Sequence, residues 1–186
     1  MRCTRSPACV RFYLLARLSS GLGDRCRYPA CPNMHTRYAT VTDAAAISAF
    51  VSEIAAEHIS PSLGDGGIDK LLASMNVDAT EQRIADNWPH ICALDGDCLT
   101  GVVVVKPPTH LYHLFVRTDL QRNGLGTKLL AMADDWCVNK SGIPLATVNS
   151  SLNAVHVYRR FGFDTDGPVI DTGGVKHQPM VRPIAG

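Results

Sequence analysis

The stretch 110-HLYHLFVRTDLQRNGLGTKLLAMADDWCVNKSGIPLATVNSSLNAVHVYRRFGF-163 decides the fold of this chain. An apolar run at 111–116 ends in a polar connector, and the hexapeptide QRNGLG at 121–126 then opens a helical pattern. A strand, a glycine-containing loop and a helix in this order can bind phosphate, because loop N–H groups converge where the helix adds partial positive charge. Gly124 and Gly126 permit close approach and positive φ, and Arg122 can add a charge-assisted contact.

By itself this loop also fits an ordinary tight turn between a strand and a helix. Two common phosphate motifs are excluded, since no third glycine completes G-x-G-x-x-G and no Lys-Ser/Thr pair completes a P-loop. A second group of residues follows downstream. It comprises a short apolar strand at 146–148, then Asn153, Tyr158 five residues later, and the turn Phe161-Gly162-Phe163.

Together the two groups resemble the signature of the GNAT superfamily of acetyl-CoA-dependent N-acetyltransferases. That signature is an L-[FY]-V strand end, a connector, [QR]-x-x-G-x-[GA] opening a helix, and a downstream Asn, Tyr and [FY]-G-F turn. The resemblance is strong over residues 99–163 and looser over 38–97 and after 164. It implies acetyl-CoA as cosubstrate, no metal, and Tyr158 as the catalytic general acid. The implied cofactor-binding residues are Leu114, Phe115, Val116, Gln121, Arg122, Asn123, Gly124, Leu125, Gly126 and Asn153.

The pattern of the chain predicts an α+β domain with a mixed sheet. Strands are expected at 37–40, 90–94, 99–106, 110–116, 145–148, 163–170 and 175–181, and helices at 44–57, 68–75, 79–87, 124–139 and 152–161. Thr42-Asp43 and Asp78 are the expected helix caps. The strand at 145–148 should pair parallel to 110–116 across a helical crossover. The resemblance adds a mostly antiparallel, twisted sheet whose central strands splay apart to admit the pantetheine arm.

Length and composition narrow the function classes. The 186 residues suffice for one domain with a sizeable core, and the formal net charge of +1 offers no general attraction to nucleic acid or membranes. No apolar run approaches the roughly 20 residues that span a bilayer. None of the seven cysteines forms a C-x-x-C pair, and Cys92, Cys98 and Cys137 are expected to be buried free thiols in a reducing, cytoplasmic setting.

Residues 1–33 differ in composition from the rest, with six arginines, one acidic residue and four cysteines. An Arg-rich, acid-poor segment is typical of a mitochondrial transit peptide. The alternative is an extension ahead of a true start at Met34, which we favour because amphipathicity is poor across the Gly and Pro positions. A cysteine metal site is disfavoured by irregular spacing. We expect this segment to be disordered, and residues 34–186 to form the acetyltransferase domain.

Amide formation from a thioester needs a neutral amine, a stabilised oxyanion and, for the leaving thiolate, a proton. The resemblance assigns oxyanion stabilisation to the backbone of Leu114–Val116. Tyr158 can donate the proton, since a phenol stays protonated at neutral pH. Four side chains are candidates for the base, each with an ordinary structural alternative: His110, His113, Glu53 and Glu57. Arg159 or Arg160 could reach phosphates or be solvated, Asp134 and Asp135 suggest a solvated helix face, and Cys137 is a poor nucleophile.

Two rival functions stay open beside the transferase. One is a non-catalytic acetyl-CoA-binding or regulatory module, and the other is a structural protein in which Gly124 and Gly126 make only a turn. The acceptor is expected to be a primary amine on a protein lysine, an N-terminus, a polyamine or an aminoglycoside. No nucleic-acid or membrane partner is expected, and a homodimer is one arrangement open to the chain.

Overall fold

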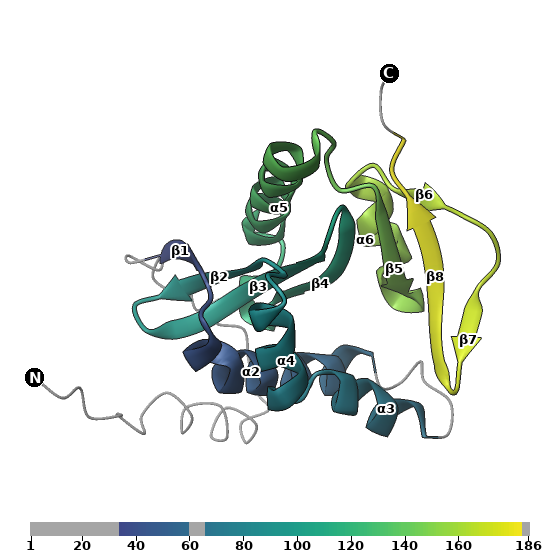
Figure 1. Cartoon of the computed structure of the whole chain (residues 1–186). Helices are drawn as coiled ribbons and strands as arrows, with labels where there is room; N and C mark the ends of the chain where they lie inside the picture. Colours follow the sequence, from purple (N-terminus) through teal and green to yellow (C-terminus); the bar gives the residue numbers. More distant parts are fainter. Residues whose placement is uncertain (1–33, 60–65, 184–186) are drawn as a thin grey trace, which may run out of the picture.

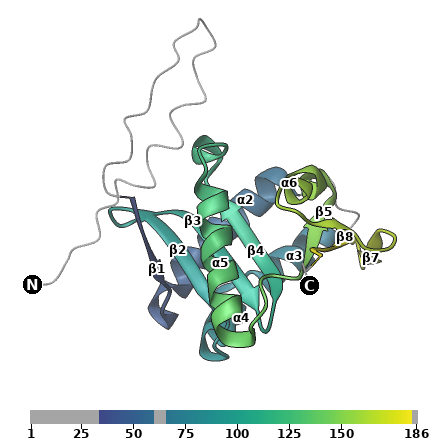
Figure 2. The same ribbon diagram turned by 90° about the horizontal axis from the view of Figure 1, so that it is seen from above.

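The computed structural model describes residues 34–59 and 66–183, where one eight-stranded sheet carries helices on both faces (Figure 1, Figure 2). The strands are β1 (Met34–Tyr38), β2 (His90–Asp95), β3 (Cys98–Lys106), β4 (His110–Val116), β5 (Thr147–Ser151), β6 (Asp164–Thr165), β7 (Ile170–Thr172) and β8 (Val175–Val181). The helices are α2 (Ala44–His58), α3 (Gly67–Ser74), α4 (Val77–Ala85), α5 (Leu125–Ser141) and α6 (Val155–Arg160). The expected α+β class is therefore confirmed.

The sheet runs in the order β1-β2-β3-β4-β5-β8-β6, with β7 paired to β8 outside this path. Every neighbouring pair is antiparallel except β4 and β5, which are parallel as the crossover predicted. The strand expected at 145–148 begins at Thr147 instead. The last helix expected at 152–161 is divided into a 3-10 turn, Leu152–Ala154, and the short α6.

The two central strands separate soon after they meet. β4 and β5 pair at only two positions, His110 with Thr147 and Leu111 with Val148, although β4 continues to Val116. The register between β3 and β4 shifts at the same place, so Tyr112 is an extra residue in β4. Because a bulge bends its strand, it directs the second half of β4 away from β5. The expected splay is thus present, and it begins at Tyr112.

Alternating residues of the central strands divide the core into two layers. Val103, Val105 and Leu111 face α5 and join Leu129 and Ala133 of that helix. Val102 and Val104, which alternate with these residues along β3, face α2 together with Cys92 and Leu94 of β2. They pack against Ile47 and Val51 of that helix. Figure 1 shows α5 above the sheet and α2, α3 and α4 below it. The period-2 alternation explains why both faces need a helical cover.

Two helix ends differ from expectation. Asn76, not Asp78, caps α4, and its side-chain oxygen accepts the Ala79 N–H at 2.8 Å. The caps differ because an N-cap side chain must precede the first helical turn, whereas Asp78 already lies within it. At α2, Asp43 does occupy the N-cap, but its carboxylate binds Arg37 at 2.8 Å and the Thr40 N–H rather than its own helix.

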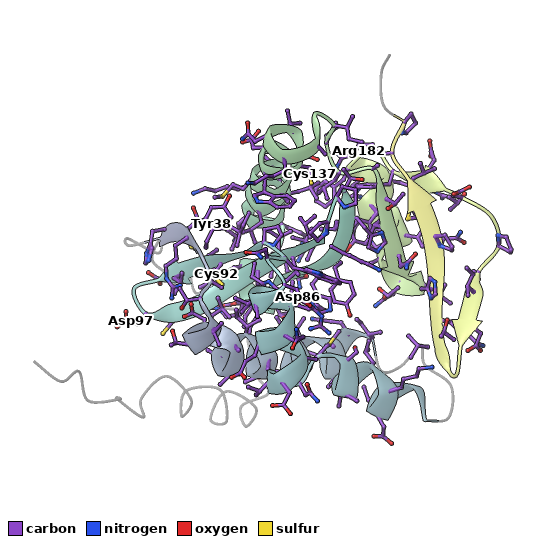
Figure 3. All side chains as sticks on the ribbon, viewed as in Figure 1. Tyr38, Asp86, Cys92, Asp97, Cys137 and Arg182 are labelled. Atoms are coloured by element: carbon purple, nitrogen blue, oxygen red, sulfur yellow. The ribbon has the colours of Figure 1, made fainter. Side chains whose placement is uncertain are left out.

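Asp134 was expected on a solvated helix face, and the structure shows otherwise. Both carboxylate oxygens lie 2.9 Å from Arg182 Nη1, and one accepts the Leu145 N–H. Arg182 also lies over the Phe163 ring, 4.4 Å from its centroid (Figure 3). Asp134 therefore links α5 to β8 and to the segment before β5. Asp135 is exposed as expected.

The cysteine expectation is confirmed at two positions and wrong at a third. Cys92 and Cys137 are buried free thiols on opposite faces of the sheet (Figure 3). Cys98 is only partly buried, next to an exposed turn, and it is disulfide-bonded. The predictions for residues 1–33 and for the loop at 60–65 lie outside the described residues. Among the residues described, no helix is both long and apolar enough to cross a membrane.

Candidate active site

The loop Gln121–Gly126 brings the chain from β4 into the N-terminus of α5. Gly124 occupies the N-cap of α5 with φ +83°, and Arg122 also has positive φ, +64°. The first intrahelical bond is donated by Lys128 to the Gly124 carbonyl at 3.0 Å. The N–H groups of the preceding turn have no carbonyl one turn earlier and point out of the helix end. Together with the helix dipole they form a donor set that suits an anion.

The glycines leave this helix end open. A Cβ built on Gly124 would meet no atom within 4 Å, and one on Gly126 would meet only Val116 Cγ2 at 3.8 Å. Packing therefore does not require glycine at 126, whereas close approach of a ligand would. Asn123, Gly124 and Lys128 also border a hollow of about 260 Å³. Met34, Leu120 and Leu125 line the same hollow, so the feature of this helix end that suits an anion is its set of backbone donors.

Not every residue of the motif can contribute in the same way. The Leu125 side chain is buried in the α5 layer, so only its backbone faces the loop. The Gln121 side chain turns back and donates to the Val116 carbonyl at 3.1 Å. Arg122 and Asn123 are exposed beside the helix end. The loop therefore presents mainly backbone donors and one free cation, Arg122.

The second half of β4 carries the free edge of the splay. Arg117, just beyond β4, donates its N–H to Thr100 of β3 at 2.9 Å. Because neighbouring residues of a strand direct their amides to opposite edges, Phe115 also faces β3, while Leu114 and Val116 face the gap toward β5. Their N–H and C=O groups can pair with an extended amide chain lying in the gap. Phe115 instead packs its ring in the layer below the sheet.

Tyr158 approaches the site from α6. Its ring packs edge-on against Phe161 and Phe163, with centroids 6.4 and 6.1 Å away. Burial raises the pKa of this phenol to about 12, so the proton stays on at neutral pH. The hydroxyl makes no hydrogen bond to any described residue, and Tyr158 as a whole is partly exposed.

Asn153 makes contacts that the sequence did not predict. Its Nδ2 donates to the His58 carbonyl at the end of α2, at 2.6 Å, and its Oδ1 accepts from Ser151 at 2.7 Å. His58 Nε2 also lies 3.0 Å from Thr118 Oγ1, which donates to Glu57 at 3.4 Å. The last residues of α2 thus connect the segment after β4 with the segment after β5, across the open end of the splay.

The four candidate bases lie in different places. His110, at the closed end of the splay, bonds Thr147 at 2.8 Å, and burial with nearby Lys106 and His177 lowers its pKa. His113 follows the bulge, where burial with Arg83 and His90 lowers its pKa to about 3. Glu53 and Glu57 are exposed on α2, and Glu57 joins the Thr118 contact. The lowered pKa values of His110 and His113 make both histidines weaker bases than a free imidazole.

Other predicted residues lie away from the gap. Arg159 and Arg160 are exposed at the end of α6. Cys137 is buried on α5, where burial raises its thiol pKa to about 11. Within residues 34–59 and 66–183, no group of three or more His, Cys, Asp or Glu side chains could hold a metal ion.

Comparison with known proteins places these features in context. The family model described as "Acetyltransferase (GNAT) domain" matches residues 59–183. No curated protein matches the chain. A GCN5-related N-acetyltransferase from Rhodopseudomonas palustris has a similar structure, with TM-score 0.65, 20% identity, and coverage of 84% of this chain and 99% of that one. The PaiA N-acetyltransferase from Thermoplasma acidophilum, solved in complex with coenzyme A, gives TM-score 0.62, 13% identity, and coverage of 81% and 99%.

Proposed function

The chain belongs to the GNAT acetyltransferase family, and from that premise we propose that it transfers the acetyl group of acetyl-CoA to a primary amine. The observation that carries the proposal is a pair of features side by side. One is the unpaired edge of β4 beyond Leu111, and the other is the open N-terminus of α5 at Gly124. The first suits an extended amide chain, and the second suits a pyrophosphate.

Each part of the cofactor has a proposed set of contacts. Backbone groups of Gln121 to Gly126 and the Arg122 guanidinium hold the phosphates. Leu114 and Val116 hold the pantetheine amides, and an N–H of this edge polarises the thioester carbonyl. Bound acetyl-CoA supplies an activated acetyl group. Phe115 and Leu125 hold the edge and the helix in place through their packing, and Asn153 borders the gap from the β5 side.

Tyr158 is the proposed general acid. A phenol with a pKa near 12 transfers its proton to a thiolate of ordinary pKa, near 8.5, only against a gradient of several pKa units. Its main contribution is therefore a hydrogen bond that strengthens as negative charge develops on the departing sulfur. The ring contacts with Phe161 and Phe163 fix the direction of that bond.

The amine attacks directly, in a ternary complex. The described free thiols, Cys92 and Cys137, are buried, and burial raises their pKa to about 12 and about 11. Neither forms a thiolate near neutral pH, so neither can carry the acetyl group. The non-catalytic binding module is the second candidate, and the free Tyr158 hydroxyl speaks against it.

The proposal also includes the extent of the catalytic unit, its location in the cell and its oligomeric state. Residues 34–186 form the catalytic unit, which acts in the cytoplasm, alone or as a homodimer. It needs no metal, and it acts on a small or protein-borne amine rather than on nucleic acid or membranes.

The test is acetyl transfer itself. Purified protein is incubated with acetyl-CoA and a panel of amines, thiol release is followed, and products are identified by mass spectrometry. The proposal predicts that mono-acetylated amine and free CoA are released in equal amounts. It also predicts that no acetyl-enzyme forms when the amine is omitted. A stable acetyl-enzyme would contradict direct attack. Tight acetyl-CoA binding without product from any amine would favour the binding module.

A further inference from the structure

The lower face of the sheet, on the side of α2, α3 and α4, carries a group of side chains just where β4 leaves β5. Tyr112, the extra residue of the bulge, contacts the His113 ring at 4.4 Å and the Trp88 ring at 5.1 Å between centroids. These rings line the sheet face at the start of the splay. An amine that meets a thioester held along β4 from this face must pass beside them.

Arg83 of α4 lies over this aromatic group. Its Cζ is 4.9 Å from the Tyr112 centroid, and its Nη2 donates to the Tyr112 hydroxyl at 3.2 Å and to the Ser74 carbonyl. Both hydrogen bonds use the same nitrogen. The Nε and Nη1 hydrogens have no partner among the described residues and are not sealed in the interior, so they face open space.

No carboxylate of residues 34–59 and 66–183 forms an ion pair within 4.0 Å with this arginine. The carboxylate one turn further on, Asp86 at the end of α4, accepts from Gln82 at 2.9 Å (Figure 3). A half-buried guanidinium without a counterion is unusual, because buried charges are normally paired.

Two lysines also lie on this lower side of the molecule. Lys106 Nζ lies 5.9 Å from the centroid of the Trp88 ring. Lys70 of α3 donates to the Thr172 carbonyl at 3.0 Å, joining the lower helices to the β7–β8 hairpin. Burial lowers the pKa of His113, and the nearby Arg83 guanidinium and His90 add to this effect. Arg83 and Lys106 thus place two cations beside this ring group, where an anion can approach them.

We propose that Arg83 binds an anionic group of the acceptor, so that the substrate is an amine that also carries a carboxylate or a phosphate. Arginine suits both groups, because its planar guanidinium presents several donors to neighbouring oxygens. The same positive surroundings lower the pKa of an amine placed beside them, which favours the neutral form needed for attack. The inference rests on the proposed acetyl transfer and names its substrate class.

The experiment compares amines that differ in one anionic group. The pairs are 4-aminobutyrate with butylamine, and O-phosphoethanolamine with ethanolamine, with putrescine as the dicationic comparison. Wild type is expected to give a kcat/KM about 10- to 100-fold higher for the anionic member of at least one pair, the effect of one or two charge-assisted hydrogen bonds. The pair that shows the preference distinguishes carboxylate from phosphate.

Variants then assign the preference to its residue. Arg83→Met keeps the length of the side chain but removes its charge. In this variant the KM for the anionic amine should rise until the preference disappears, and Arg83→Lys should restore part of the preference. Lys140→Met, which removes an exposed cation at the end of α5, should leave it unchanged. Unfolding curves establish that each variant is folded. Equal loss for the anionic and neutral amines in Arg83→Met would make Arg83 merely structural and overturn the inference.

A binding measurement separates the two proposals. With CoA saturating, 4-aminobutyrate and O-phosphoethanolamine are titrated into wild type and Arg83→Met in a calorimeter. Binding of either to wild type, weakened tenfold or more by the substitution, supports the Arg83 site without any turnover. Binding of neither, or equal binding to both proteins, overturns it while leaving acetyl transfer intact. Failure of acetyl-CoA itself to bind would remove the proposed function, and this inference with it.

Discussion

The two sides of the β4–β5 splay are built in different ways. The side that faces α5 offers backbone groups: the free edge of β4, and the turn at Gly124 that opens the helix. The side that faces α2, α3 and α4 offers side chains such as Arg83 and Tyr112. The first arrangement comes from the continuous stretch 110–126, whereas the second brings together side chains of α4 and β4.

This difference explains what each side can recognise. Backbone donors suit the phosphates, a part of the cofactor that does not vary with the acceptor. Their position depends on the conformation of the loop and not on which side chains it carries. Side chains gathered from distant elements can change independently, and they set the shape and charge of the acceptor site. Variants placed on one side should therefore leave the other side's ligand unaffected.

The largest effect is expected at Tyr158, which packs against the core layer on the α5 side. Tyr158→Phe removes the proton and the hydrogen bond to the departing sulfur, and kcat should fall about 100-fold, the lower end of general-acid effects because the phenol is a weak donor. The Kd for acetyl-CoA should stay unchanged. Steady-state rates and calorimetric binding check both statements, with Tyr38→Phe on an exposed tyrosine as control. An unchanged kcat would remove Tyr158 from the chemistry.

A matched pair of glycines tests the α5 side alone. Gly124 and Gly142 cap opposite ends of α5 with φ +83° and +79°, and a Cβ at either position meets no atom within 4 Å. Alanine at each should cost about 1 kcal/mol of stability through backbone strain. Only Gly124→Ala should also weaken acetyl-CoA binding, about tenfold, because its Cβ enters the proposed phosphate site. Equal acetyl-CoA affinities in the two variants would place the phosphates elsewhere.

The burial of His113 beside Arg83, on the other side, predicts a pH effect on stability. The pKa of His113 is near 3 in the folded protein and about 6.5 when unfolded, so between these values the unfolded chain binds more protons. Stability therefore rises with pH over this range and is lost on acidification. From pH 7 to 5, His113→Phe should lose about 1–2 kcal/mol less than wild type. Urea unfolding measures this, with the exposed His156→Gln as control, and parallel losses in all three proteins would contradict the assignment.

The smallest effect is expected at the bridge between the sides. Asn153→Ala removes the bond to the His58 carbonyl and should cost about 1 kcal/mol of stability. Acetyl-CoA and the acceptor should each bind a few-fold more weakly, because α2 borders both sites. Thermal unfolding and the two KM values measure this. A large change in acetyl-CoA affinity alone would instead make Asn153 a direct cofactor ligand, as the family resemblance implied.

The sequence could predict features built from one continuous stretch, but not those built from residues that lie far apart in the chain. The loop at 121–126, α5 and the parallel crossover follow from local patterns, and the family resemblance implied the splay that leaves the strand edge free. The contacts of Asp134 with Arg182 and of Asn153 with His58 were not, because they join residues 48 and 95 positions apart. The unpaired charge of Arg83 was missed for the same reason. On sequence alone it is one more polar residue of an amphipathic helix.

The most direct test of the central claim is thermal unfolding with and without acetyl-CoA, in wild type and in Arg122→Ala combined with Gly124→Ala. At 100 times its Kd, a ligand adds about 2.7 kcal/mol of stability, which raises the Tm of a domain of this size by about 5 to 10 °C. The account predicts this rise in wild type and its loss in the double variant. No rise at saturating acetyl-CoA, or an equal rise in both proteins, would contradict a phosphate site at Gln121–Gly126.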